Sequence, residues 1–144
     1  MGLLSTAHAT STPSAEGYWK TIDDVTGKPK SIVRISRAAD NTLMGEVVRL
    51  YPAKGEDPNR LCTACTGNLH NRPVVGMVIL SGLKPQDVSW GEGRILDPHN
   101  GKTYKCMARL TAHGEKLKVR GYIGLPAFGR SQTWQRVDLM SAQG

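Results

Sequence analysis

The clearest structural signal in this chain is the stretch VSWGEGRILDPHNGKTYKCMARL, residues 88–110. Its two halves alternate apolar and polar side chains, as half-buried strands do. Between them lies DPHNG at 97–101, where the proline presets a turn torsion and the Asn-Gly pair tolerates positive φ. We therefore predict an antiparallel hairpin, with Asp97 bonding its own backbone rather than acting as a functional carboxylate.

The same alternation, interrupted by turn residues, recurs along all 144 residues. The 16 Gly and 8 Pro leave few windows long enough for helices, which excludes an all-helical bundle. The predicted strands are 17–23, 31–37, 43–50, 74–80, 88–96, 103–110, 116–123 and 132–138. A sheet of antiparallel strands that pair in sequence order is expected to close into a barrel, because a closed sheet has no exposed edge. We predict an all-β fold: a single antiparallel up-and-down β-barrel of about eight strands, filled by side chains or holding one small ligand.

The chain divides into a leader, one domain and a short tail. Residues 1–15 are expected to be a disordered leader, either a signal-peptide remnant or a tag, because Ala7-His8-Ala9 fits the small-x-small pattern of a signal-peptidase site. The β-barrel domain covers 16–139, and 140–144 form the tail. We therefore expect a periplasmic or otherwise exported protein.

A long loop over 51–73 carries Cys62 and Cys65 as Cys-Thr-Ala-Cys. In an exported protein a disulfide is the default for such a pair, and a metal half-site or a redox couple are the alternatives. Because there is no second Cys-x-x-Cys and no closely spaced histidine pair, we predict neither a metal nor a cofactor. Cys106 is expected to be a buried, inert thiol. A second irregular stretch, 124–130, is a candidate lid or plug at a barrel mouth.

Several motifs resemble a known family. Gly17-Tyr18-Trp19 opens the first strand and Arg136 comes near the end of the last, which resembles the lipocalin arrangement of a tryptophan packed under a C-terminal arginine at the closed barrel end. The wider pattern comprises GYWKTID at 17–23, TGKPKS at 26–31, CTACTG at 62–67, PVVGM at 73–77, GRILDP at 93–98, NGKTY at 100–104, LKVRGYIG at 117–124 and FGRSQTW at 128–134. Over 16–137 the chain is similar to the exported bacterial family known as domain-of-unknown-function family 2147. The resemblance implies a lipocalin-like β-barrel and export, with Trp19 and Arg136 in a structural stack, and it implies no activity.

The net charge of +7 is concentrated between residues 102 and 136, which hold eight basic residues and one acid. On the polar face of 116–124, Lys118, Arg120 and Tyr122 either point to solvent or turn Arg120 and Tyr122 inward. Facing inward, a forked guanidinium and a phenol would hold a carboxylate or phosphate head group. The candidate ligand-binding residues are Trp90, Arg120, Tyr122, Phe128 and Arg130.

Three functions fit these observations. We favour a small exported barrel that binds an amphipathic or anionic ligand in the cell envelope. The first alternative is a non-enzymatic interaction protein whose basic C-terminal strands dock an acidic partner or an anionic lipid surface. The second is a thiol or metal function at Cys62 and Cys65. Common catalytic signatures are missing, so we predict no enzyme; export and only 3 Trp, 4 Tyr and 1 Phe argue against nucleic-acid binding.

Overall fold

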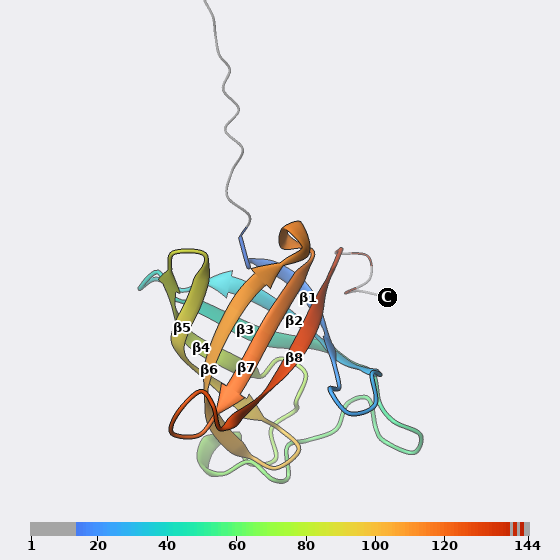
Figure 1. Cartoon of the computed structure of the whole chain (residues 1–144). Coiled ribbons are helices and arrows are strands. Elements are labelled where there is room, and N and C mark those ends of the chain that lie inside the picture. The colour runs from blue at the N-terminus through green and yellow to red at the C-terminus, as the bar shows by residue number, and fades with distance from the viewer. Residues whose placement is uncertain (1–13, 139, 141, 143–144) are drawn as a thin grey trace, which may run out of the picture.

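In the computed structural model, which describes residues 14–138, 140 and 142, eight strands form one closed barrel (Figure 1). The strands are β1 (Gly17–Ile22), β2 (Pro29–Arg37), β3 (Leu43–Leu50), β4 (Val78–Gln86), β5 (Ser89–Asp97), β6 (Lys102–Thr111), β7 (Lys116–Tyr122) and β8 (Gly129–Val137). Two short 3-10 turns, η1 (Gly67–Leu69) and η2 (Ala112–Gly114), lie in the connections. The predicted all-β class is confirmed.

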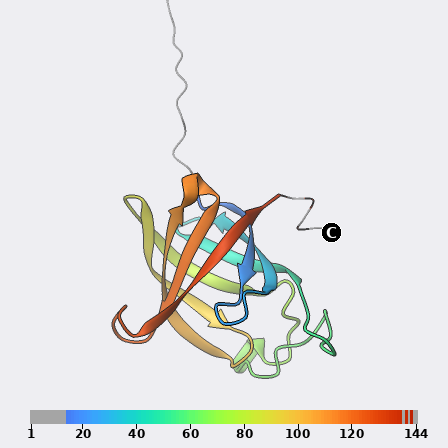
Figure 2. The same ribbon diagram turned by 45° about the vertical axis from the view of Figure 1, so that its right-hand side comes forward.

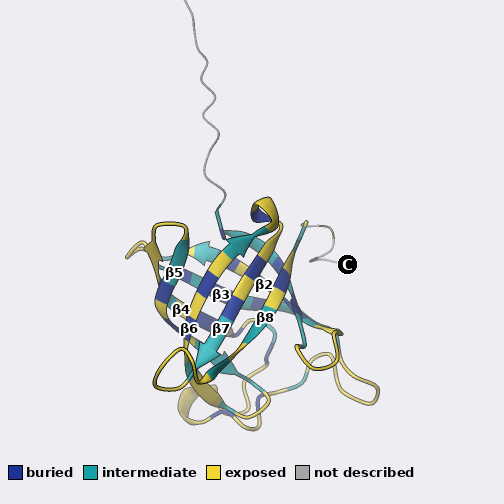
Figure 3. Cartoon of the chain, in the orientation of Figure 1, coloured by how far each residue is buried: buried dark blue, intermediate teal, exposed yellow. Residues whose placement is uncertain are grey.

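Each strand pairs antiparallel with its sequence neighbour, and β1 also pairs with β8. In that closing pair Trp19 lies opposite Arg136. Buried and exposed residues alternate along the strands (Figure 3), as expected when successive side chains point to opposite faces of a sheet. The predicted up-and-down barrel is therefore confirmed.

The fourth strand is the main departure from the prediction. The sequence places it at 74–80, whereas β4 runs from Val78 to Gln86. Gly76, with φ of 95°, turns the chain before the strand begins. The strand then continues past Gly82, whose φ is 67°, and through Pro85. Glycine and proline usually interrupt strands, so pattern reading ends the strand where the chain in fact continues.

Successive connections alternate between the two ends of the barrel (Figures 1 and 2). One end, which we call the mouth end, carries the connections 23–28, 51–77, 98–101 and 123–128. The closed end carries the start of β1, η2 and the last residues of β8. The long loop that the sequence predicts at 51–73 thus extends to residue 77.

The closed end is sealed by a stack of Arg136 on Trp19. The guanidinium carbon lies 4.4 Å from the centroid of the indole ring, and Trp19 is fully buried. Trp19 donates its Nε1–H to the Ala15 carbonyl at 2.8 Å. Arg136 donates to the carbonyls of Gly114 at 2.8 Å and Glu16 at 2.9 Å. The structure therefore has the stack that the lipocalin-like motif predicts.

Gly17 is required by this seal. A Cβ at this position would come 2.8 Å from Nη1 of Arg136, and the backbone φ of 132° also disfavours any side chain. The Gly-x-Trp pattern thus places a glycine where the arginine passes and a tryptophan where it stacks.

The chain before β1 contributes to the closed end as well. Ser14 and Ala15 belong to the predicted leader, but they are packed against this end of the barrel. Ala15 is buried, and the Ser14 carbonyl accepts a hydrogen bond from Arg136. The rest of the predicted leader, 1–13, lies outside the described residues, and only Met140 and Ala142 of the predicted tail are described. Among the described residues, no helix is long and apolar enough to cross a membrane.

Candidate ligand cavity at the mouth end

The inward-facing side chains become smaller from the closed end to the mouth end. The change follows three strands: Trp19 to Thr21 on β1, Val33 to Ser31 on β2, and Leu117 to Gly121 on β7. Because the backbone diameter of a closed sheet does not shrink with its side chains, the mouth half keeps space that the closed half fills. Side-chain size, read along each strand, thus predicts where the barrel is hollow.

A cavity of about 1020 Å³ occupies the mouth half. This volume lies at the upper limit of the roughly 300–1,000 Å³ of ordinary small-molecule sites. Trp134, which is buried, contributes to its lining. The apolar lining comes mainly from Val47, Leu50, Val74, Ile79, Ile95 and Val119. The large closed-half side chains, such as Trp19 and Leu117, are not part of this lining.

The polar side chains of the inner wall are already paired with one another. The hydroxyls of Thr21 and Ser31 lie 2.7 Å apart, and Trp134 donates its Nε1–H to Gln132 Oε1 at 3.0 Å. In the part of the chain that the structure describes, no buried side-chain nitrogen or oxygen lacks a partner. The inner wall therefore presents mostly apolar surface, which suits the apolar body of a ligand.

Five carboxylates line the rim of the cavity, and each is held by a neighbouring group. They are Asp23, Asp24, Glu56, Asp57 and Asp97. The backbone N–H groups of Thr26 and Val25 donate to Asp23 at 3.0 and 2.7 Å and hold the pKa of that carboxyl below its ordinary value. Asp97 accepts the His99 N–H at 2.8 Å, which confirms the predicted turn role.

Two of these carboxylates belong to the long 51–77 loop. Glu56 accepts the Ala53 N–H at 2.9 Å, and this bond lowers the pKa of Glu56, which the nearby charges of Arg60 and Lys30 lower further. Asp57 accepts a backbone N–H of its own turn at 2.8 Å. Both groups are therefore acceptors that the protein already uses.

The Lys and Arg side chains of the rim form fewer hydrogen bonds and ion pairs than its carboxylates do. Arg130 pairs with Asp24, with Nη2 and Oδ2 2.8 Å apart, and so ties β8 to the β1–β2 connection. Lys28, Lys30 and Arg60 also line the cavity and form no ion pair within the described residues. The rim thus offers free donors and occupied acceptors.

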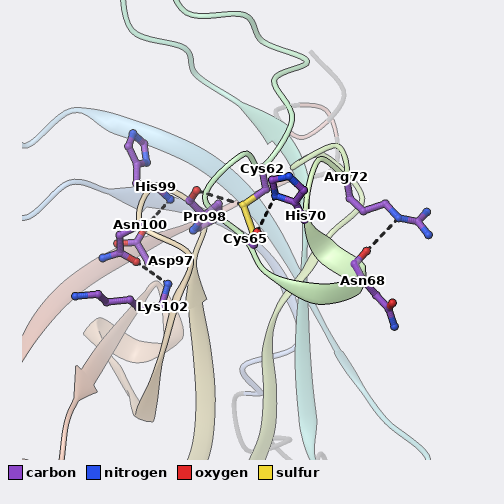
Figure 4. The surroundings of a disulfide bond; sticks show 10 residues. All are labelled: Cys62, Cys65, Asn68, His70, Arg72, Asp97, Pro98, His99, Asn100 and Lys102. Carbon is purple, nitrogen blue, oxygen red and sulfur yellow. Dashed lines mark hydrogen bonds between the residues drawn. A yellow bond between two sulfur atoms is a disulfide. The ribbon is translucent and has the colours of Figure 1, made fainter.

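A disulfide between Cys62 and Cys65 shapes the 51–77 loop (Figure 4). Both cysteines are buried, and Cys62 exchanges backbone hydrogen bonds with the other arm of the loop, donating to Arg72 O at 2.7 Å and accepting from Asn71 N at 2.8 Å. The predicted disulfide is therefore present. Among the described residues, no group of three or more His, Cys, Asp or Glu side chains could hold a metal ion.

The disulfide loop rests directly on the β5–β6 turn. A Cβ at Gly101, whose φ is 73°, would collide with the Ala64 carbonyl oxygen. Cys62 Sγ also lies 3.4 Å from the Pro98 carbonyl oxygen. The β5–β6 turn, which is the clearest turn signal in the sequence, therefore also supports the 51–77 loop that borders the cavity.

Two of the predicted ligand-binding residues do not line the cavity. Arg120 points to the outer side of the barrel, where it donates to Pro126 O at 2.7 Å, Ser131 Oγ at 2.9 Å and Gly129 O at 3.2 Å. The inward positions on β7 belong to Leu117, Val119 and Gly121, so alternation sends Arg120 outward. Of the two directions that the sequence left open, the structure has the outward one, so the choice of Arg120 as a ligand-binding residue is corrected: it holds the β7–β8 connection in place.

Trp90 is the other correction. It lies opposite Ala108 near the closed end and packs against the apolar core rather than into the cavity. The backbone between Trp90 and Gly93 carries a bulge, with Glu92 at φ 57°, which shifts the register and is invisible to a period-2 count.

The remaining predicted residues do border the cavity. Tyr122, Phe128 and Arg130 stand at its rim, and Phe128 is 70% exposed. Trp134 and Gln132 are lining residues that the sequence reasoning did not select. Counting back by twos from Arg136, which must face inward to meet Trp19, would have found both.

Cys106 is fully buried on β6, opposite Gly93 and Gly121, and does not line the cavity. Burial in apolar surroundings raises the pKa of this thiol to about 12, so it stays protonated and unreactive. The predicted burial of Cys106 is confirmed, and its inertness stays a prediction.

Comparison with known proteins places the chain in a family. The model of DUF2147, described as an uncharacterized protein conserved in bacteria, matches residues 17–136. The chain belongs to this family. The match begins at Gly17 and ends at Arg136, so the DUF2147 pattern includes both the closed-end seal and the cavity.

A solved structure shares the fold. The protein HP1028 from the human pathogen Helicobacter pylori, described as belonging to the lipocalin family, superposes with a TM-score of 0.75 at 21% sequence identity, covering 92% of this chain and 88% of its own. This likeness supports a lipocalin-like barrel for the DUF2147 chain. No curated protein matches the chain in sequence.

Proposed function

We propose that this DUF2147 barrel binds a small amphipathic molecule at its mouth end, with the apolar body inside and the polar head at the rim. The observation that carries the proposal is the cavity of about 1020 Å³, walled by apolar side chains in a barrel whose other end is sealed. Barrels of eight strands are wide enough to hold one small ligand. We assign the protein a binding role rather than a catalytic one, in keeping with its fold.

The rim favours a head group that accepts hydrogen bonds. Lys28, Lys30 and Arg60 are its uncommitted donors, whereas its carboxylates are already bonded. A carboxylate or phosphate head fits donors of this kind. Because five lining carboxylates face four lining Lys and Arg residues, the rim carries little net charge and selects the head by contact rather than by long-range attraction.

We also propose that the protein works outside the cytoplasm. The disulfide Cys62–Cys65 persists most readily in an oxidising compartment such as the periplasm. Fractionation of the host that finds the chain, with oxidised cysteines, outside the inner membrane would support this location, and recovery of the reduced chain in the cytosol would contradict it.

Calorimetric titration with alkyl amphiphiles that share one chain length tests the proposal. A carboxylate, a quaternary ammonium and an uncharged sugar head provide the three arms. We expect saturable one-to-one binding, strongest for the carboxylate. In Lys30→Gln/Arg60→Gln the preference for the carboxylate should fall about tenfold while the uncharged amphiphile binds as before, since a hydrogen bond to a charged group contributes roughly 1.5–3 kcal/mol.

The control is Lys54→Gln/Lys84→Gln, which changes the net charge equally at exposed residues that do not line the cavity. It should bind all three amphiphiles as the natural protein does. Failure of every amphiphile to bind saturably would refute the proposed function, and native mass spectrometry of protein from its own host would identify a co-purifying ligand.

A further inference from the structure

The outer wall formed by β6, β7 and the neighbouring part of β5 is strongly basic. The residues that we call the basic wall are Arg94, Lys105, Arg109, Lys116 and Lys118, all exposed. They lie on adjacent strands, with Lys105 opposite Arg94 and Arg109 opposite Lys118. The outward positions of β6, β7 and β8 contain no Asp or Glu. This surface is separate from the cavity, whose lining includes none of these five residues.

Like charges directly opposite each other destabilise a sheet. Within the described residues, no member of the basic wall forms an ion pair. Glu92, the nearest carboxylate on β5, is paired with Lys84 instead, at 3.4 Å. The fold therefore keeps two repulsive cross-strand pairs that it does not neutralise.

The opposite wall shows that this chain can neutralise its arginines. On β2, Arg34 pairs with Glu46 at 3.5 Å and Arg37 pairs with Glu16 at 3.0 Å. The unneutralised charge is therefore a local property of the basic wall and not a consequence of the overall excess of Lys and Arg. A surface that retains mutual repulsion is suited to a partner that supplies the missing negative charge.

The residues of the basic wall indicate what kind of negatively charged partner it can bind. Its centre is Met107, 36% exposed, and the other outward residue types of β6 are Thr, Lys and Arg. Protein interfaces are usually anchored by buried aromatic side chains, and single-stranded nucleic acids stack on aromatic platforms. The outward positions of β6 have neither, and Tyr122 on β7, which lies opposite Lys105, stands at the rim of the cavity. Attraction of clustered Lys and Arg to anionic lipids needs no matching shape.

We propose that the basic wall binds the surface of a membrane rich in anionic phospholipids. β6 begins at the mouth end and finishes at the closed end, so the basic wall spans the height of the barrel and the protein lies on its side against the lipid. The contact is peripheral and electrostatic. It is independent of ligand binding in the cavity and goes beyond it, since either property can exist without the other.

Co-flotation with vesicles tests this proposal. Vesicles of phosphatidylcholine mixed with phosphatidylglycerol should carry the protein, and vesicles of phosphatidylcholine alone should not. Each Lys or Arg near an anionic surface strengthens binding about fivefold, so Lys105→Gln/Arg109→Gln/Lys118→Gln should weaken partitioning roughly a hundredfold. Raised salt should release the natural protein, because exposed charges are screened.

The matched control is Arg34→Gln/Lys54→Gln/Lys84→Gln, which removes the same charge from exposed residues outside the basic wall. It should retain most of the binding. Because the variant of the basic wall relieves repulsion, its urea midpoint should be equal to or above that of the natural protein, which separates lost binding from lost folding. Equal weakening in both variants, binding that salt does not reduce, or retention on DNA or an acidic polypeptide without vesicle binding would each overturn the proposal.

Discussion

The closed half and the mouth half of this barrel share the same strands and differ in the side chains that those strands send inward. On β1, Trp19 fills the closed half and Thr21 faces the mouth half two residues later. On β7, Leu117 and Gly121 make the same contrast. One continuous sheet is therefore a packed core at one end and a container at the other. Side-chain size therefore decides which part of this barrel can receive a ligand.

The contrast predicts that the closed half supplies most of the stability. Trp19→Ala should lower the free energy of unfolding by about 3–5 kcal/mol, because it leaves a cavity in a packed region. Thr21→Ala should cost only about 1 kcal/mol, since it removes one hydroxyl pair beside existing space. Urea denaturation measures both. Similar losses at the two positions would show that the two halves are equally packed.

The seal itself should be sensitive to the shape of its arginine. Arg136→Lys should lower the free energy of unfolding by about 2 kcal/mol. An ammonium group cannot bond all the separate carbonyls that the guanidinium reaches, so at least one carbonyl loses its partner. Arg130→Lys, at an exposed ion pair of the rim, should change stability by less than about 1 kcal/mol. Thermal unfolding followed by circular dichroism compares the pair. A larger loss at Arg130 would reverse the assignment of the sealed end.

The disulfide loop provides an intermediate case at the rim. Cys62→Ser/Cys65→Ser should lower the free energy of unfolding by roughly 2 kcal/mol, which is the chain-entropy contribution of so small a ring. The larger change should be local: the amides of Cys62 and Asn71, which bond across the loop, should exchange with solvent much faster. Hydrogen exchange read by mass spectrometry checks this, with the amide of Val119 on β7 as an unchanged reference. Uniform acceleration along the chain would instead mean that the loop holds the whole barrel together.

The smallest expected effect concerns Cys106 in the apolar core of the barrel. With its pKa raised to about 12 by burial, the thiol should not react with a chromogenic disulfide reagent at about pH 8 in the folded protein. Unfolding should expose one reactive thiol, and Cys106→Ala should abolish that signal. Reaction in the folded state would show that solvent reaches the core around Cys106.

Much of the barrel follows from the sequence because period-2 alternation and turn chemistry are local. The hairpin at 97–101, the closing strands and the disulfide are all read from short segments. Strand β4 was misplaced because Gly82 and Pro85 resemble interruptions. In the structure β5 keeps one register on both sides of Gly82 and pairs Pro85 with Trp90, while the register with β3 shifts beside Gly82. This pairing depends on cross-strand contacts which no single segment contains.

The site was harder to predict than the fold. Arg120 and Trp90 were chosen for their chemistry, whereas their direction depends on parity and on one bulge beside Gly93. Trp134 could have been found by parity from Arg136, since both positions face inward on β8. The mouth loops come from four separate connections, so which of their charges meet at the rim is a tertiary property.

The most direct test of the cavity fills it from within. Gly121 faces inward, and an added Cβ would lie 3.5 Å from Ile95 and 3.7 Å from Tyr104, so Gly121→Leu can project into the cavity without a clash at the backbone. Binding of the apolar fluorescent probe N-phenyl-1-naphthylamine should be saturable in the natural protein. It should be at least about tenfold weaker in Gly121→Leu. The control is Thr133→Leu, at an outward position on β8, which should bind the probe as the natural protein does. Equal binding by natural protein and Gly121→Leu, with all three proteins folded, would contradict the claim that this half of the barrel is the container.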